Sequence, residues 1–192
     1  MIQRYDSQQL PVSRWRNGGG ETREIVSYPP GVVDFDWRIS IATIASDGDF
    51  STFPGIDRII TLLSGDVALY RQGALIQHLA LNQPFAFPGE EAIAARLAGG
   101  CSTDFNIMAR RSRYQPEAGI ATQRFAPQDE VSGVVYVIAG EWQYADGVLA
   151  ADGVLAAGQG AWWEDGAGEF VALSENAQLL WGTLRAKAPR GV

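Results

Sequence analysis

The chain has few of the residues that carry covalent or metal chemistry. Its 192 residues include one cysteine, Cys101, and one histidine, His78. A single cysteine excludes a disulfide within the chain and favours a reducing cytoplasm, and we expect Cys101 to be a small buried hydrophobe. One histidine without a cluster of cysteines or carboxylates is a poor basis for a zinc, iron or manganese site. We therefore expect no catalytic metal, no cofactor and a solvated His78.

Long apolar runs and lysine are also scarce. No apolar run approaches the roughly 18–20 residues that a membrane helix needs, and the first residues lack the apolar core of a signal peptide. We therefore expect a cytoplasmic protein without a membrane partner. The net charge of −7 argues against nonspecific binding of nucleic acid. All cations except Lys187 are arginines, the side chain that grips carboxylates with two hydrogen bonds.

Short β-rich runs alternate with turn residues along the chain, which contains 22 glycines and 9 prolines. Residues 36–44 alternate apolar and polar side chains with the period of two that is typical of a strand. Similar runs occupy 56–65, 133–144, 169–173 and 178–184. No segment has the pattern of a long amphipathic helix. We predict an all-β protein.

Two parts of the chain repeat one another. Residues 59–70 resemble 134–145 at an offset of 75 residues, and each copy is an apolar strand, a glycine turn and a second strand. Two such copies are typical of β-barrel or jelly-roll halves, and the pattern resembles a bicupin, which is a duplicated cupin fold. We expect cupin-like halves at 1–112 and 113–192, packed as one compact unit, with the ligand pocket in the first.

The first half lacks the metal ligands of a cupin. The position of the cupin's glutamate ligand, seven residues before Gly65, holds Arg58. The positions of the paired histidines fall around 51–54 and that of the later histidine near Ile93, and neither place contains histidine. Within this resemblance the barrel is metal-free, so other polar groups have to line any pocket.

The stretch WRNGGGETREI, residues 15–25, has more glycine and more functional groups than a turn needs. It lacks the spacing of a phosphate-binding loop. Two interpretations remain open: an Asn–Gly hairpin turn with a bulge, or glycines that let backbone N–H groups approach a ligand. In an extended segment Glu21 and Arg23 would share one face, and Thr22 and Glu24 the other.

Three arginines are candidates for a cationic pocket. If Arg23, Arg38 and Arg58 converge, they form a cavity suited to a small anion inside an acidic protein. Spacing alone favours the alternative, in which the three arginines lie on the surface in weak ion pairs. Asp104 and Asn106 lie two residues apart on one predicted strand, and they would supply an acceptor and an amide if they point inward.

Aromatic and small polar side chains would complete such a pocket. Phe50 and Phe53 are candidate walls, and Ser40 shares a strand face with Arg38. Trp15 and Trp37 are candidate platforms for stacking a ligand, although burial in a core is the commoner fate of a tryptophan.

Four segments together resemble the HutD/Ves family: WRNGGGETREI, DWRISIATIASDGDFSTFPGIDRIITLLSG, QPFAFPGE and DFNIMARR. The resemblance runs in order from about residue 10 to residue 182. It implies a metal-free bicupin of the RmlC-like cupin superfamily, with no enzymatic activity firmly attached. HutD members are associated with histidine utilisation in bacteria, and their proposed role is to bind a pathway intermediate such as formylglutamate or urocanate. Ves members are associated with the response to low temperature.

The resemblance favours a shared pocket over surface ion pairs. It implies ligand binding by the residues that match the family's motifs: Trp15, Asn17, Gly18, Gly19, Glu21, Thr22, Arg23, Arg38, Ser40, Phe53, Arg58, Asp104 and Asn106. The arginines would neutralise a carboxylate, beside hydrogen bonds from the amides, the threonine and the glycine loop. The two acids would orient the arginines or accept from a donor on the ligand. Arg23 is decisive, because it should point into the same cavity as Arg58.

The resulting hypothesis is a cytoplasmic protein that binds a small anionic metabolite and regulates histidine utilisation. One alternative is a metal-free cupin-like isomerase or hydrolase that uses Glu21 or Asp104 as a base. Another is an interaction module whose Trp-rich strand edge, GAWWEDG at 160–166, pairs with a partner. The sequence leaves homodimerisation open.

Overall fold

The fold is built from β-strands. The computed structural model describes residues 2–145 and 153–188, and all regular elements in these ranges are strands. None of the described segments forms a helix of the length and apolar character that crossing a membrane requires. The all-β prediction is confirmed, because the alternating run at 36–44 forms one strand and that at 56–65 forms another.

The described chain divides into two compact units. The 11–116 unit consists of Pro11–Pro116 with the segment from Lys187 onward, and the 117–186 unit consists of Glu117–Ala186 with the segment up to Leu10. The first residues therefore lie with the second half, whereas the sequence-based division placed them in the first. The reason is long-range pairing: β1 (Ile2–Asp6) is hydrogen-bonded antiparallel to β17 (Gln159–Trp163).

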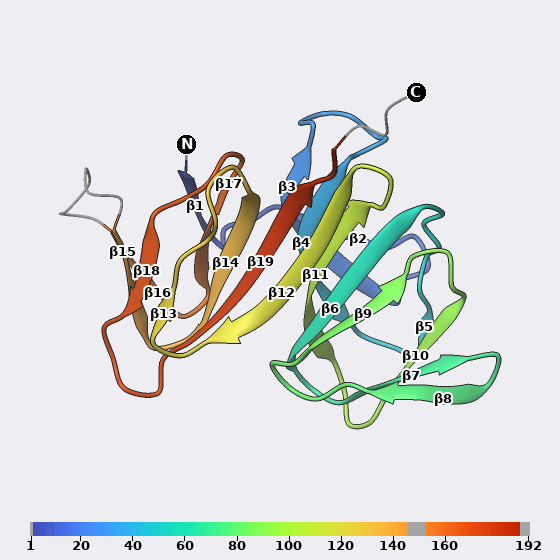
Figure 1. The fold of residues 1–192 in the computed structure, drawn as a ribbon. Helices are drawn as coiled ribbons and strands as arrows, with labels where there is room; N and C mark the ends of the chain where they lie inside the picture. Colours follow the sequence, from blue (N-terminus) through green and yellow to red (C-terminus); the bar gives the residue numbers. More distant parts are fainter. Residues whose placement is uncertain (1, 146–152, 189–192) are drawn as a thin grey trace. The chain divides into compact units, whose positions relative to one another are not determined.

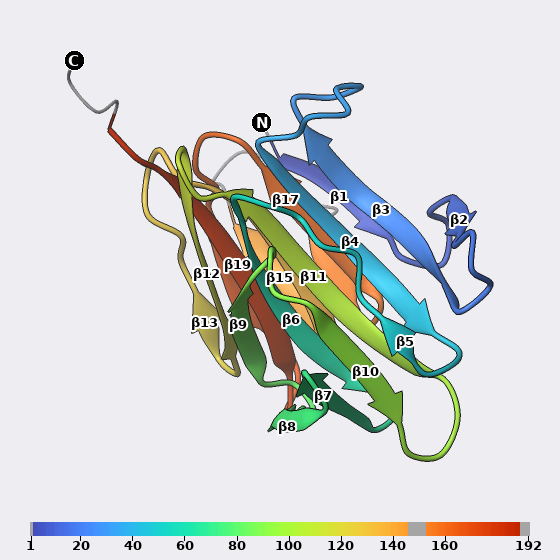
Figure 2. The same ribbon diagram turned by 90° about the vertical axis from the view of Figure 1, so that its right-hand side faces the viewer.

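Two sheets make up the 11–116 unit (Figure 1, Figure 2). The larger sheet has the strand order β2 (Val12–Arg14), β3 (Gly20–Tyr28), β4 (Trp37–Ile44), β11 (Ser102–Arg110), β6 (Ile56–Ser64) and β9 (Pro84–Pro88). The smaller sheet has the order β5 (Gly48–Asp49), β10 (Ile93–Leu97), β7 (Val67–Arg71) and β8 (Ala74–His78). Ile60 and Leu62 from the larger sheet join Val67 and Leu69 from the smaller one in an apolar core. This core leaves the other end of the larger sheet's inner face for polar side chains.

The 117–186 unit also has two sheets. One has the order β1, β17, β14 (Ser132–Ala139), β19 (Gln178–Ala186) and β12 (Tyr114–Ala121), and the other has the order β13 (Arg124–Phe125), β18 (Glu169–Ala172), β15 (Glu141–Ala145) and β16 (Val154–Ala156). Its core contains Trp142, Trp163 and Phe170.

The tryptophan-rich strand of this unit is not a free edge. β17 pairs with β1 on one side and with β14 on the other. Trp163 is fully buried, and its indole N–H donates to the Val131 carbonyl oxygen at 2.8 Å. The expectation of an exposed Trp-rich edge is therefore wrong, because both rows of backbone hydrogen-bonding groups already have strand partners.

Equivalent glycine turns mark the internal repeat. Gly65 joins β6 to β7 with φ of 90°, and Gly140 joins β14 to β15 with φ of 75°. A Cβ atom at Gly65 would lie 2.7 Å from Ser102, and one at Gly140 would lie 2.4 Å from Ser174. Both turns need glycine for its left-handed backbone and for the close approach of a serine.

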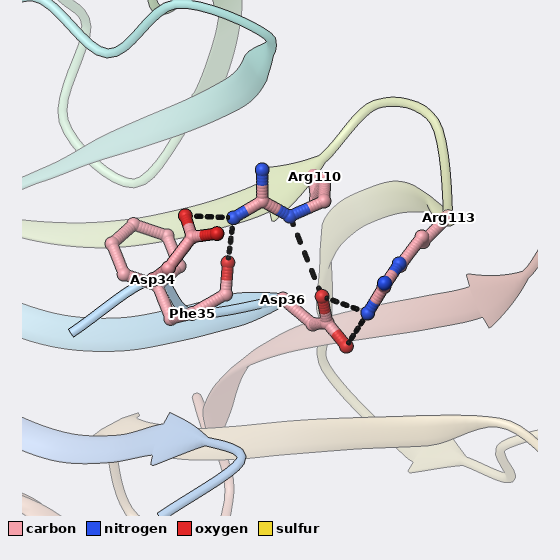
Figure 3. Close-up of polar contacts among 5 residues, drawn as sticks. All are labelled: Asp34, Phe35, Asp36, Arg110 and Arg113. Carbon is pink, nitrogen blue, oxygen red and sulfur yellow. Dashed lines mark hydrogen bonds and ion pairs between the residues drawn. The ribbon is translucent and has the colours of Figure 1, made fainter. Parts of the chain in front are cut away.

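Two arginines of the 11–116 unit hold a loop in place (Figure 3). Arg113 donates from Nη1 to both carboxylate oxygens of Asp36 at 2.8 Å. Arg110 donates to Asp34 and to the Phe35 carbonyl oxygen, the latter at 2.8 Å. These contacts tie the loop before β4 to the end of β11, so the abundance of arginine is partly structural.

The expectations for the single histidine and the single cysteine have different outcomes. His78 is exposed at the end of β8, as expected, and its Nε2 lies 2.8 Å from Asp66 Oδ1. Cys101 is exposed rather than buried. The expectation for Cys101 is wrong because it follows Gly99 and Gly100 in the turn between β10 and β11, where the side chain faces outward.

Candidate functional site

A cavity of about 500 Å³ lies on the inner face of the larger sheet of the 11–116 unit. The sheet contributes Thr22, Arg38, Ser40, Ala42, Ile44, Arg58, Asp104, Asn106 and Met108. The segment before β3 and the segment around β5 contribute Ser13, Arg14, Trp15, Arg16, Asn17, Asp49, Phe50, Ser51 and Phe53. Nine of the thirteen residues named from the sequence therefore meet at one cavity.

Strand register explains the polar floor of this cavity. Met108 of β11 lies between Arg38 of β4 and Arg58 of β6. Two residues earlier on β11, Asn106 lies opposite Ser40. Successive side chains of a strand alternate between faces, so these residues project to the same side. The period-two spacing seen in the sequence is what brings them together.

Arg58 is the buried cation of the cavity, with 8% of its surface exposed. Its Nη2 donates to Asn106 Oδ1 at 3.1 Å, and its guanidinium carbon lies 4.9 Å from the Phe87 ring centroid and 5.4 Å from that of Phe50. Its Nε is buried and has no hydrogen-bond partner within the described residues. Burial lowers the pKa of Arg58 to about 10, an effect that the Arg38 charge increases and the Asp104 charge opposes. Arg58 therefore remains cationic at neutral pH, with an N–H group to offer.

Asp104 is the buried acid of the cavity, with 2% of its surface exposed. Its Oδ1 accepts a hydrogen bond from Asn106 Nδ2, whereas Oδ2 is buried without a partner in the described chain. Burial raises the pKa of Asp104 to about 7, although the Asn106 hydrogen bond and the Arg58 charge lower it. Asn106 thus links the acid to the arginine, and one oxygen of the acid stays unsatisfied.

Arg38 is held by an acid on the neighbouring strand. Its Nε lies 2.8 Å from Glu24 Oε2. Glu24 and Thr22 are two residues apart on β3, opposite Ser40 and Ala42 of β4, so both face the cavity side of the sheet. Arg38 therefore enters the cavity wall with part of its charge already compensated.

The glycine-rich stretch is a hairpin loop whose tight turn is closed by its own hydrogen bonds, and the Gly19 carbonyl oxygen also accepts from Ala45 N–H at 2.9 Å. Gly18 N–H donates to the Trp15 carbonyl oxygen at 3.0 Å, and Gly19 N–H donates to Asn17 Oδ1 at 2.9 Å. Gly18 has φ of 71°, and a Cβ atom at Gly20 would lie 2.3 Å from the Thr43 carbonyl oxygen. The expectation that Gly18 and Gly19 offer N–H groups to a ligand is wrong, because the loop uses both. Neither glycine lines the cavity, and Gly19 borders a neighbouring hollow of about 190 Å³.

The loop places Trp15 against the cavity. The Trp15 indole N–H donates to Thr22 Oγ1 at 2.8 Å. A Cβ atom at Gly20 would also lie 2.9 Å from the Trp15 ring, so glycine makes room for it. The other candidate platform, Trp37, is fully buried and stacks on Tyr28 with 5.1 Å between ring centroids. Only the first tryptophan lines the site.

Arg23 and Glu21 do not line the cavity. They lie opposite Ile41 and Thr43 on β4, on the other face of the sheet from Thr22. Arg23 Nη2 lies 3.7 Å from Glu21 Oε1. The expectation that Arg23 shares the cavity with Arg58 is wrong, and the role of Glu21 as a base there falls with it. The sequence showed which residues share a face, but not which face is turned inward.

The structure adds two arginines that the sequence argument did not select. Arg14 and Arg16 line the cavity on either side of Trp15, and both are exposed. Neither has an ion-pair or hydrogen-bond partner among the described residues. Their place beside Trp15 in the family-like segment was a usable signal. Arg14 is the last residue of β2 and Arg16 begins the turn, and the alternation argument missed them because residues 13–16 all line the cavity.

The side chains that can ligate a metal do not come together in the described residues. No group of three or more histidine, cysteine, aspartate or glutamate side chains lies close enough to hold a metal ion within residues 2–145 and 153–188. In the cavity the charged groups are four arginines, two of them unpaired, with Asp49 and Asp104. This chemistry suits an anion.

Comparisons with known proteins show the family and the fold of the chain. The model of the HutD family matches residues 7–181. Protein Ves of Citrobacter koseri is 44% identical over 182 residues, which cover 94% of this chain and 92% of the relative. The structure of HutD from Pseudomonas fluorescens SBW25 has a TM-score of 0.82 at 27% identity and covers 98% of this chain and 100% of that chain. A cupin 2 conserved barrel domain protein from Leptotrichia buccalis has a TM-score of 0.58 at 11% identity and covers 96% of each chain, which shows a shared cupin fold.

Proposed function

Because the chain belongs to the HutD family, we propose that it binds a small carboxylate anion in the cavity of the 11–116 unit. The proposed ligand is an intermediate of histidine breakdown, such as N-formylglutamate or urocanate. The proposed consequence of binding is regulation of histidine utilisation in the cytoplasm. Asp104 and Asn106 select the ligand, and Trp15 and Phe53 form its apolar walls.

The observation that carries this proposal is the state of Arg58. A buried guanidinium with an unpartnered N–H group is costly unless a partner arrives. A carboxylate supplies that partner with the geometry a guanidinium prefers. Arg38 lies close enough for its charge to lower the pKa of Arg58, so an anion between them relieves the repulsion.

Isothermal titration calorimetry with N-formylglutamate, urocanate and glutamate tests the proposal. We expect heat from at least one of them and loss of that heat in the Arg58→Met variant. Arg23→Gln is the matched control, because it removes a guanidinium from the other face of the same sheet. No heat with any of the three compounds would refute the proposal, as would an Arg58→Met variant that binds normally.

One observation favours a second candidate function. A buried carboxylate whose pKa is raised to about 7 has the properties of a general base at neutral pH. The cavity would then belong to a metal-free isomerase or hydrolase with Asp104 as the base. Proton NMR of N-formylglutamate or urocanate incubated with the protein decides between the two. Turnover that is lost in Asp104→Asn while binding persists would favour the enzyme, and unchanged compound would favour the binding protein.

A further inference from the structure

The buried Asp104 carboxyl is the one acid on the floor of the cavity, and an anion that reaches Arg58 must lie near it. Asp104 lies two residues before Asn106 on the same face of β11, and Asn106 is hydrogen-bonded to both Asp104 and Arg58. The entering anion would therefore meet a cation and an acid that are joined through a single amide. A carboxylate would repel an ionised Asp104, whereas it would accept a hydrogen bond from a protonated one.

The surroundings of Asp104 give its free oxygen no competing partner. Its neighbours across the strands are Ala42 on β4 and Leu62 on β6, both apolar. Oδ1 is used by Asn106, and Oδ2 is buried without a partner among the described residues. An oxygen in this position is the natural site for a proton, because the neutral acid avoids the cost of a buried charge.

We propose that Asp104 binds the ligand as a protonated carboxylic acid, so that its Oδ2–H donates to the bound carboxylate and binding takes up one proton from solvent. This inference rests on the proposed function of the cavity. It makes Asp104 a specificity-determining residue that favours carboxylates over neutral ligands. A carboxylic acid kept neutral by an apolar site is a known way to place a donor against a developing or bound anion.

The other charged groups around the cavity do not supply this proton. Arg14 and Arg16 come from the β2–β3 hairpin, Arg38 from β4 and Arg58 from β6. Guanidinium groups stay charged across the neutral range. Asp49 from β5 is the other carboxylate of the lining, and it is exposed to solvent. Asp104 alone combines burial, an apolar surround and an unpartnered oxygen.

Calorimetry of N-formylglutamate and of glutarate in buffers of different ionisation enthalpy measures the protons exchanged on binding. Carboxylates of such probes titrate near pH 4, so they do not contribute above pH 7. At pH 8 we expect the wild type to take up about 0.9 proton, and its affinity to fall about eightfold from pH 7.5 to pH 8.5. Glutarate has no N–H group, so uptake with both probes assigns the effect to the carboxylate.

Asp104→Asn gives the sharper result, because an amide donates permanently where the acid donates only when protonated. We expect this variant to bind without proton uptake and with affinity independent of pH. At pH 8.5 it should bind about 30-fold more tightly than the wild type. Glu21→Gln is the control, because it removes a carboxylate from the other face of the sheet, and it should behave as the wild type.

Several results would overturn the inference. Proton release, or no proton exchange, would show that Asp104 stays ionised in the complex. Loss of the pH dependence in Asp49→Asn would assign the proton to the other acid. In these cases the proposed binding function survives. If neither probe produces heat with the wild type and the three compounds of the first test also fail, the proposed function is wrong and the inference falls with it.

Discussion

Arg58 contacts Asn106 directly, with Nη2 3.1 Å from Oδ1, and reaches the acid of the cavity only through that amide. The buried charges are therefore separated by one neutral group. A direct ion pair would use the hydrogen-bonding groups of both side chains. The linked arrangement instead leaves Arg58 Nε and Asp104 Oδ2 without hydrogen-bond partners in the described structure. The arrangement is typical of a site that is completed by a ligand.

Arg58→Met should abolish ligand binding without harming the fold. We expect affinity for the bound carboxylate to fall about 100-fold or more, since the removed cation is desolvated. Thermal unfolding should shift little or upward, because a buried charge is replaced by an apolar side chain of similar length. Calorimetry and a thermal melt of the same sample measure the two effects. A large loss of stability would instead make Arg58 a structural residue.

Asp104 should make the protein less stable as the pH rises. Its pKa is raised from 3.8 to about 7 in the folded state, so the folded state binds the proton more tightly than the unfolded state. Stability is then highest below the unfolded pKa, falls between about pH 4 and pH 7, and reaches its full loss of about 4 kcal/mol above pH 7. Urea unfolding at pH 5 and pH 8 measures the fall. Asp104→Asn should gain stability relative to the wild type at pH 8, and an equal pH slope in both proteins would contradict this assignment.

Thr22→Val should loosen the hairpin that forms one cavity wall. The change removes the hydroxyl that accepts from the Trp15 indole at 2.8 Å but keeps the shape of the side chain. We expect a loss of about 1 kcal/mol and faster amide hydrogen exchange in residues 12–22. Thr22→Ser retains the hydroxyl and should behave as the wild type. Equal exchange in all three proteins would show that the indole hydrogen bond does not hold the wall.

Gly20→Ala and Gly18→Ala should differ in cost. A methyl at Gly20 meets the Thr43 carbonyl oxygen at 2.3 Å, whereas a methyl at Gly18 meets nothing within 4 Å and pays only for φ of 71°. We expect losses of about 3 kcal/mol and about 1 kcal/mol respectively in urea unfolding. The opposite order would mean that this loop needs glycine for its backbone conformation and not for the close approach of Thr43 and Trp15.

Arg14 and Arg16 should speed the arrival of the anion. They are exposed, unpaired and on the cavity wall of an otherwise acidic protein. In low salt, the double change Arg14→Gln and Arg16→Gln should slow association about tenfold in stopped-flow measurements. The difference should vanish at high salt, because exposed charges are screened. Arg23→Gln, on the other sheet face, should leave the rate unchanged.

Local pattern predicted much of this molecule. The alternation at 36–44 predicted a strand, and the same rule correctly grouped Asp104 with Asn106 and separated Thr22 from Arg23. The rule is relative, because a period of two shows which side chains share a face but not which face is turned inward. Thr22 faces the cavity, so Arg23 cannot.

Features set by distant chain segments were beyond this reasoning. The pairing of β1 with β17 joins residues more than 150 positions apart, and nothing near residue 2 in the sequence indicates it. The exposure of Trp-rich β17 was misjudged for the same reason. Arg14 and Arg16 were missed because residues 13–16 all line the cavity where β2 ends and the turn begins, and a period of two does not predict a run of consecutive lining residues.

The hairpin of β2 and β3 satisfies its own tight turn, with Gly18 and Gly19 donating inside the loop. One wall of the cavity therefore has a turn that closes itself, whereas the floor is formed by strands that are paired on both sides. Relatives with other ligands could be generated by exchanging residues 12–19 as a cassette over an unchanged floor. Gly18 and Gly19, which first suggested contact with a ligand, would then serve to close a turn whose other residues can be exchanged.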